Sequence, residues 1–345
     1  MKTSQEEIAI IEVGAPGSPG VAIATTSFHT EYNKEKNLAK MKRWIEKAAS
    51  KGARLVVFPE QGLQGYICFP PQDPMPLEQF QYQYKNAETI PGPATDELTV
   101  LAKKHNLYIV IGMTERNSQY AGGIGALFNS MALIGSEGVI GIYRKVHLPG
   151  NEHHVYVGGS GFHVYDTTVG RIGMNICHDK SFPETGRELM IKGSDIIVHS
   201  TAWPKSGPLT VYGVTEKEYS GYISELMERH TAAANQVWFV SSNNFGVDVK
   251  TNADFIGYSR IIHPSGIVIA NSGEKEAIVV AHGLDMRGEI FKQRTEYCLS
   301  LNLPRDRVPS AYSDISKDLR YPPYVPEKGT TELYEIEKKS KAYQG

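Results

Sequence analysis

Apolar residues recur along this chain with two different periods, and their alternation predicts a protein of interleaved strands and helices. Short runs rich in valine, isoleucine and other apolar residues are typical of buried strands. These runs occupy residues 8–13, 21–27, 54–58, 107–115, 128–134, 138–143, 169–176, 195–199, 238–242, 258–263, 267–271 and 277–284. The first run is expected to form a hairpin strand, separated from the second by a turn rich in glycine and proline.

Longer segments carry apolar residues three or four positions apart, which is the spacing of one face of an α-helix. Helices are predicted over residues 33–50, 93–106, 183–192 and 216–235. In the last of these, the apolar stripe is expected to face the core, and its histidine is expected to be packed there rather than to bind a ligand. The stripe consists of Tyr219, Tyr222, Ile223, Leu226, Met227 and His230.

Both halves of the chain repeat the order of strand, helix, strand and hairpin-like pairs, and no linker-like segment separates them. This order predicts an α/β protein with a two-sheet core covered by helices, in one domain from residue 8 to residue 286. Residues 287–345 are more polar and less regular. We expect this C-terminal extension to pack at a subunit interface.

Composition excludes several classes of partner. With a formal net charge of −2 and an isoelectric point near 6.6, the chain has no basic field for nucleic acid or an anionic membrane. No apolar stretch at the N-terminus is long enough for a signal peptide or a spanning helix. The cysteines at 68, 177 and 298 are odd in number and widely spaced, so they do not form a disulfide framework. A cytoplasmic protein is therefore predicted.

The candidate nucleophile is Cys177, which ends the apolar run of 169–176 and precedes a helix start at 181–184. A thiol at a strand-to-helix junction is accessible, and backbone N–H groups at such a turn can receive a developing oxyanion. The alternative is that Cys177 is a small buried apolar residue, as free cysteines usually are. From this stretch alone the two interpretations are equally good.

Two charged residues also follow predicted strands. Glu60 comes after the strand of 54–58, and Lys145 comes after the strand of 138–143. Open α/β sheets place their sites at the carboxyl ends of strands, which makes both residues candidates for the same site. On position alone, however, Glu60 is more easily explained as a solvated carboxylate.

A glycine-rich loop at 150–161 carries Glu152, His153 and His154. It matches neither phosphate-binding pattern, because it lacks GxxxxGK[ST] and does not link a strand to a helix through GxGxxG. The adjacent histidines lack the spacing of a helical metal pair, and the chain has no CxxC. No metal and no cofactor is predicted.

Several motifs in order resemble the nitrilase superfamily of carbon-nitrogen hydrolases. They include GARLVVFPE at 52–60, FNSMALI at 128–134, YRKVHLP at 143–149, ICHDKSFPE at 176–184, TAWP at 201–204 and GYSRIIHPSG at 257–266. The resemblance covers roughly residues 20–285 and implies a four-layer α-β-β-α sandwich that forms homodimers or higher homo-oligomers. It also implies a catalytic triad of Glu60, Lys145 and Cys177.

The resemblance assigns a role to each of these residues. Glu60 takes the thiol proton of Cys177 and returns it to the leaving nitrogen. Lys145 and the backbone N–H of His178 stabilise the oxyanion. Glu152 resembles the family's second glutamate, which positions the lysine and the substrate nitrogen. Here the spacing from the lysine is shorter than in many members, and Gly158-Gly159 replaces the usual Pro-Gly, so a surface carboxylate is the alternative for Glu152.

The residues after the cysteine bear on the reaction. His178-Asp179 is more similar to amidases than to true nitrilases, which usually have Trp-Glu there. D-amino-acid carbamoylases generally carry two arginines where this chain has Lys180 and Ser181, so a bidentate clamp for a carboxylate is lost.

The leading hypothesis is hydrolysis of a small primary amide through a cysteine thioester. Alternatives are a nitrilase, an N-carbamoyl hydrolase and a catalytically silent binding scaffold. Substrate contacts are predicted for a set of residues that could equally be core packing, with Lys180 as the candidate for a substrate carboxylate. The set is Tyr66, His153, His154, Lys180, Phe182 and Trp203.

Overall fold

The computed structural model describes residues 8–66, 77–119, 125–297 and 300–317. The chain divides into two compact units, Met1–Arg305 and Asp306–Gly345. Helix α6 (Met286–Thr295) belongs to the first unit, where Met286 and Ile290 join the core. The described part of the second unit contains a short 3-10 helix, Pro309–Tyr312. The expected role of the C-terminal extension at a subunit interface remains a prediction.

Apart from a separate two-stranded hairpin, the strands of the first unit form two halves of one continuous sheet. The halves meet where β2 pairs with β12, through Ser27 opposite Asn243 and Phe28 opposite Asn244. The first half runs β6 (Gly138–Arg144), β5 (Ala126–Gly135), β4 (Tyr108–Asn117), β3 (Leu55–Val57), β2 (Val21–Phe28), β16 (Ala277–Leu284) and β1 (Ile10–Val13). The second runs β15 (Val268–Asn271), β14 (Arg260–Ile262), β12 (Trp238–Val247), β9 (Ile196–Thr201), β8 (Gly170–Ile176) and β7 (Val164–Thr167).

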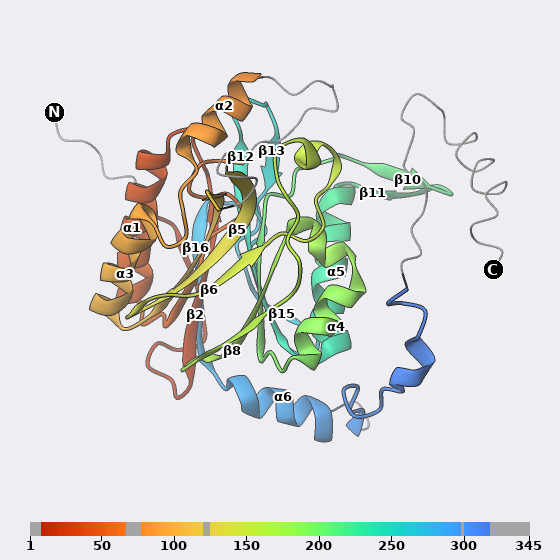
Figure 1. Ribbon diagram of the computed structural model, residues 1–345. Helices are drawn as coiled ribbons and strands as arrows, with labels where there is room; N and C mark the ends of the chain where they lie inside the picture. Colours follow the sequence, from red (N-terminus) through yellow and green to blue (C-terminus); the bar gives the residue numbers. More distant parts are fainter. Residues whose placement is uncertain (1–7, 67–76, 120–124, 298–299, 318–345) are drawn as a thin grey trace. The chain divides into compact units, whose positions relative to one another are not determined.

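Three separate apolar cores show that these halves are stacked between helices. The largest core contains side chains of both halves, such as Val57 and Val198. A second lies between the first half and helices α1 (Lys34–Ser50) and α3 (Pro93–His105). A third packs α4 (Pro183–Ile191) and α5 (Tyr219–Asn235) on the second half. Figure 1 shows the two helix pairs on opposite sides of the strands. This is the predicted α-β-β-α order.

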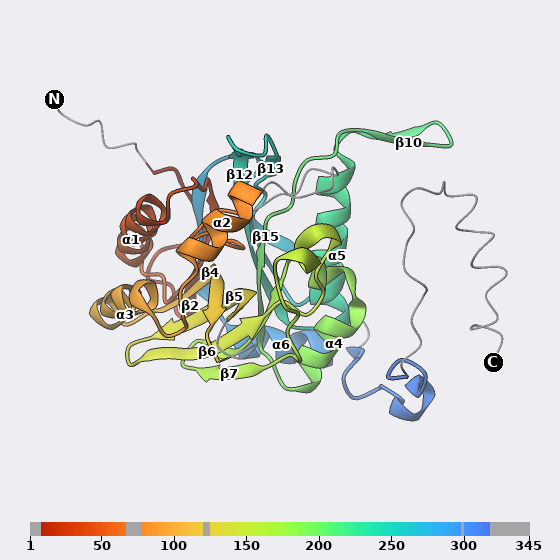
Figure 2. The ribbon, with the colours of Figure 1, turned by 45° about the horizontal axis from the view of Figure 1, so that its top comes forward.

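The predicted helices and strands are present with small shifts at their ends, but one pairing differs. Strand β1 does not pair with β2, because β16 lies between them and pairs parallel with β1 and antiparallel with β2. The sequence pattern missed helices α2 (Leu77–Asn86) and α6, strands β7 and β13 (Asp254–Ile256), and the hairpin of β10 (Leu209–Val211) and β11 (Val214–Glu216). The hairpin strands have three residues each and are exposed throughout, so their alternation is too short to be recognised as a strand signal. Figure 2 shows the hairpin extending away from the sheets.

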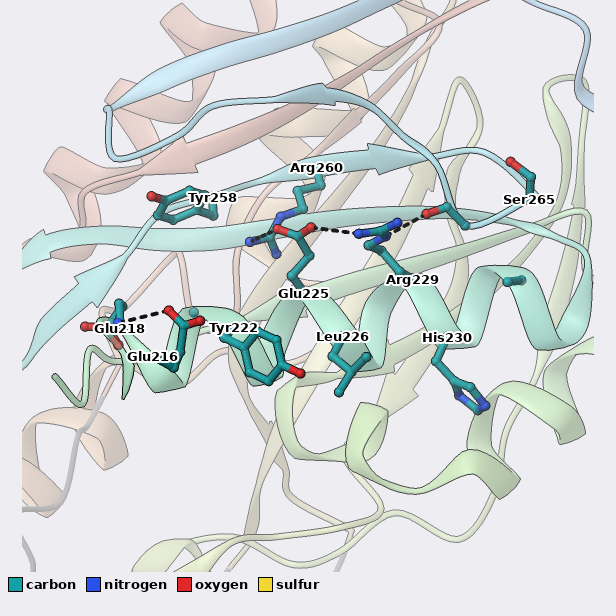
Figure 3. A pocket seen from close by; sticks show the side chains of 13 residues that line it. Glu216, Glu218, Tyr222, Glu225, Leu226, Arg229, His230, Tyr258, Arg260 and Ser265 are labelled. Atoms are coloured by element: carbon teal, nitrogen blue, oxygen red, sulfur yellow. Dashed lines mark hydrogen bonds and ion pairs between the residues drawn. The ribbon is translucent and has the colours of Figure 1, made fainter. Parts of the chain in front are cut away.

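The orientation of helix α5 is opposite to the prediction. The expected buried stripe faces outward: Tyr222 is 50% and Leu226 48% exposed, and His230 is exposed as well. The helix instead buries polar residues, among them Ser224 and Glu228. This is possible because Lys180 and Arg260 neutralise the Glu228 carboxylate inside the protein. Figure 3 shows the outward-facing side chains along this helix.

Candidate active site

The four predicted reacting residues come from four separate elements and lie together. Glu60 follows β3, Lys145 follows β6, and Cys177 follows β8, while Glu152 lies on the 3-10 turn Gly150–His154. All four are buried, with exposed fractions of 0% for Glu60 and Lys145, 1% for Glu152 and 5% for Cys177. The carboxyl ends of strands from both halves of the sheet therefore build one site, as the strand-end positions predicted.

Lys145 joins the two carboxylates. Its Nζ donates to Glu60 Oε1 at 2.7 Å and to Glu152 Oε1 at 2.8 Å. Burial disfavours the charged ammonium, but the carboxylates of Glu152 and Glu60 outweigh it and hold the pKa of Lys145 well above its usual value. The lysine therefore remains a cation at neutral pH.

Further donors fix the carboxylates. Asn129 of β5 donates from Nδ2 to Glu60 Oε1 at 2.7 Å and to Glu152 Oε2 at 3.5 Å. The backbone N–H of Ala202 donates to Glu60 Oε2 at 2.9 Å, and the Tyr66 hydroxyl donates to Glu152 Oε1 at 2.7 Å. Sequence reasoning missed Asn129, although an asparagine within an otherwise apolar strand was a signal. Tyr66 contacts a carboxylate of the site, which fits its predicted location.

The surroundings of Glu60 change its acidity. Burial raises the pKa of Glu60 above its usual value, the neighbouring Glu152 carboxylate also raises it, and Lys145 and Asn129 oppose the rise. A carboxylate with a raised pKa is a stronger base than an exposed one. It is therefore better suited to accept a proton from a weakly acidic thiol.

Cys177 has a backbone conformation that residues other than glycine rarely adopt, with φ of 47°. It begins the 3-10 turn Cys177–Ser181, which connects β8 to α4. Burial and the Glu60 carboxylate raise the pKa of the thiol to about 12, while Lys145 and the Thr201 hydroxyl lower it. Without substrate the sulfur is therefore protonated, and its proton must be removed as it attacks.

Two glycines allow the close backbone approaches that this site needs. A Cβ at Gly112 of β4 would lie 2.3 Å from the carbonyl oxygen of Pro59, next to Glu60. A Cβ at Gly159 would lie 2.1 Å from the carbonyl oxygen of Arg144, next to Lys145. Gly159 also donates its N–H to the Lys145 carbonyl at 2.8 Å. The Gly158-Gly159 sequence thus keeps the glycine that packs against the end of β6.

The remaining predicted substrate residues differ in their surroundings. His153 and His154 are exposed, although they adjoin buried Glu152. Phe182 stacks on His147 with ring centroids 3.9 Å apart, and its edge packs near the His178 ring. Neither contact tests a role in substrate binding.

Lys180 is bound within the protein. Its Nζ donates to Ser224 Oγ at 2.5 Å and to Glu228 Oε1 at 2.9 Å, and lies 4.3 Å from the centre of the Trp203 ring. Its side chain is buried, so the protein itself supplies the carboxylate that its charge was expected to bind in a substrate.

Within the described ranges, no group of three or more His, Cys, Asp or Glu side chains is arranged to hold a metal ion. Among the same residues, no helix has the length and apolar character needed to cross a membrane. Cys177 is a free thiol. The predicted absence of a disulfide framework also concerns Cys68 and Cys298, which lie outside the described residues.

Comparison with known proteins agrees with this architecture. The sequence model of the carbon-nitrogen hydrolase family matches residues 20–288. The chain belongs to this family. It is therefore a carbon-nitrogen hydrolase of the nitrilase superfamily, as its motifs predicted.

Similar proteins include several amidohydrolases. Citrullinase of Francisella tularensis is 30% identical, over 86% of this chain and 97% of that protein. N-carbamoylputrescine amidase of Solanum lycopersicum is 28% identical, over 85% of this chain and 93% of that protein. A carbon-nitrogen hydrolase structure from Helicobacter pylori superposes with a TM-score of 0.70 at 22% identity, covering 86% of this chain and 98% of that one. The last comparison supports the nitrilase-like fold.

Proposed function

We propose that this carbon-nitrogen hydrolase cleaves the terminal C–N bond of a small primary amide, giving an acid and ammonia through a Cys177 thioester. One observation carries the proposal: a buried lysine bridges two buried carboxylates, at 2.7 and 2.8 Å, beside a buried thiol. This set supplies a nucleophile, a base and a cation within one water-poor site.

Acylation begins when Cys177 Sγ attacks the amide carbon and the thiol proton passes to Glu60. The new S–C bond converts the carbonyl oxygen into an oxyanion, which the Lys145 ammonium and the backbone N–H of His178 stabilise. The C–N bond then breaks, and protonated Glu60 gives its proton to the departing nitrogen. Ammonia and a thioester are the products of this half-reaction.

Deacylation uses the same groups in reverse. Glu60 takes a proton from water, the hydroxide attacks the thioester carbon, and the S–C bond breaks to release the acid. Protonated Glu60 returns its proton to the departing sulfur, which restores the thiol and the carboxylate. Glu152 holds Lys145 at 2.8 Å and orients the substrate nitrogen. The family relationship supports this sequence of steps. In a glutamate-to-glutamine mutant of an amidase from Nesterenkonia sp. AN1, the acetamide moiety of fluoroacetamide is covalently added at the active-site cysteine, which supports a nucleophilic cysteine at this place in the fold.

A second candidate substrate is a terminal ureido group, R–NH–CO–NH2, which shares the carboxamide end of a primary amide. The names of the citrullinase and N-carbamoylputrescine amidase relatives favour it. The Lys180 ammonium already forms a buried ion pair with Glu228. A substrate with a carboxylate close to the reacting carbon therefore gains no ion pair from that lysine. A nitrile is the third possibility for the same residues.

An ammonia-release screen distinguishes these substrates. Matched compounds with one side chain and either a primary amide, a ureido or a nitrile terminus are offered to the wild type and to Cys177→Ala. We expect the wild type to favour the amide and the variant to release no ammonia. If only the ureido or only the nitrile compound reacts, the alternative function holds. If no compound reacts and Cys177 cannot be acylated, the protein is a silent scaffold.

We also propose that the enzyme forms a homodimer through the outer face of α5. A groove of about 670 Å³ follows this face, with Tyr222 and Leu226 at its centre. Glu218 and Glu225 lie toward the N-terminal end of the helix, and Arg229 and His230 toward the C-terminal end (Figure 3). Two copies of this face in antiparallel contact would place acidic residues opposite basic ones, which is the self-complementarity that a two-fold interface requires.

Leu226→Arg tests this interface. The substitution is expected to convert the dimer into monomers, because it places a cation in the apolar centre of the contact. Light scattering coupled to size-exclusion chromatography measures the mass. Val100→Arg is the matched control, because Val100 is an exposed apolar residue of α3 on the opposite side of the sheets. A Leu226→Arg protein with the wild-type mass would disprove the interface.

A further inference from the structure

Asp179 is completely buried and accepts four hydrogen bonds. Oδ2 accepts from the Tyr143 hydroxyl at 2.6 Å and from the Ile176 N–H at 2.9 Å. Oδ1 accepts from the His147 N–H at 3.0 Å and lies 2.8 Å from His147 Nδ1. None of these groups belongs to the proposed reacting set.

The positions of these partners along the chain are informative. Tyr143 and His147 each lie two residues from Lys145, on either side of it. Ile176 and Asp179 in turn enclose Cys177. A single carboxylate therefore connects the end of β6, which carries the lysine, to the turn that carries the thiol. The two segments belong to different halves of the sheet, and residues of both, among them Tyr143 and Ile176, also share the central apolar core.

We propose that Asp179 is a positioning residue that sets the location of the Lys145 ammonium relative to the Cys177 thiol. The inference rests on the proposed function, in which these two groups act on the same carbonyl. An oxyanion is stabilised well only when its donors are already aligned. A carboxylate that bonds both segments fixes this alignment before substrate arrives.

Only a charged carboxylate satisfies this set of partners. The Ile176 and His147 backbone groups are obligate donors, and Tyr143 remains a donor because burial and Asp179 raise the pKa of its hydroxyl well above the usual value. An asparagine at 179 offers one acceptor oxygen and turns an NH2 group toward donors on its other side. One of the two segments would then lose its connection.

The test compares Asp179→Asn with Tyr143→Phe and Asp195→Asn. Asp195 provides a matched control because its Oδ2 accepts a backbone N–H bond from Arg171 at 2.9 Å, at the far end of the β8–β9 pair. For Asp179→Asn we expect kcat to fall about 100-fold with KM changed less than about threefold, as a displacement near 1 Å would cause. Tyr143→Phe, which removes one bond, should lose about tenfold. Asp195→Asn should keep the wild-type kcat.

A second readout does not depend on the substrate. The rate of Cys177 alkylation by iodoacetamide is followed against pH in the folded proteins, with folding verified by circular dichroism. Loss of the Asp179 charge alone would shift the profile to lower pH, because a nearby anion disfavours the thiolate. In Asp179→Asn we expect the opposite shift, to higher pH, because the thiol loses part of the effect of the displaced Lys145 charge, and a shift to lower pH would count against the inference. An unchanged alkylation profile, or an unchanged kcat, would overturn the inference. Absence of amide turnover in the wild type would instead refute the proposed function and leave the alkylation result to decide the role of Asp179.

Discussion

Replacing Cys177 with alanine is expected to lower ammonia release from the best substrate by at least about 10⁴-fold, since no thioester can then form. The thiol is 5% exposed and part of the central core, so alanine leaves only a small space and the protein should remain folded. Ammonia release and the melting temperature are measured on the same preparation. Loss of activity without loss of folding identifies the sulfur as the nucleophile.

Cys68→Ala and Cys298→Ala are the matched controls for this substitution and should keep wild-type turnover. Alkylation supplies an independent measure. Because burial and the Glu60 carboxylate raise the pKa of the Cys177 thiol to about 12, its alkylation rate should still rise above pH 9, where an ordinary cysteine has levelled off. Wild-type turnover in Cys177→Ala would exclude the thioester mechanism.

The sequence contained enough information to predict the elements that bring the reacting residues together. Glu60, Lys145 and Cys177 each follow an apolar run that forms a strand, buried before Glu60 and Cys177 and partly buried before Lys145, so the strand-end rule predicted a common site. Their roles came from the family motifs, because a lone strand-end carboxylate has no distinguishing local pattern. The repeated strand and helix rhythm predicted a two-sheet core covered by helices, and the family resemblance implied the four-layer α-β-β-α order.

The contacts between distant segments could not be predicted in the same way. Asn129 bonds both carboxylates across 69 and 23 residues of chain, and no local pattern specifies such a pairing. The prediction for helix α5 failed in a different way. Its periodicity correctly predicted a helix, but the face predicted to be buried is the one that faces outward. The position of Glu228 was decisive there: its partners, Lys180 and Arg260, come from other elements, and together they make a polar helix face suitable for burial.

Lys145→Met is expected to destabilise the protein by about 3–5 kcal/mol, because it leaves the buried carboxylates of Glu60 and Glu152 without their cation. Burial already raises the pKa of Glu60, and removal of the lysine raises it further. A carboxyl whose pKa is higher in the folded protein than in the unfolded chain costs stability as pH rises above the unfolded value. The deficit should therefore be larger at pH 8 than at pH 5, measured by urea unfolding.

The double variant Lys145→Met with Glu152→Gln separates stability from catalysis. With one carboxylate neutralised, the repulsion between the two side chains disappears, and much of the lost stability should return. Turnover should not return, because the oxyanion still lacks the ammonium of Lys145. Recovery of both stability and turnover in the double variant would mean that Lys145 serves only to neutralise the buried carboxylates. Glu152→Gln alone is the control, because Glu152 is itself proposed to orient the substrate nitrogen. If stability returns while turnover in the double variant stays well below that of Glu152→Gln, Lys145 acts directly on the substrate carbonyl.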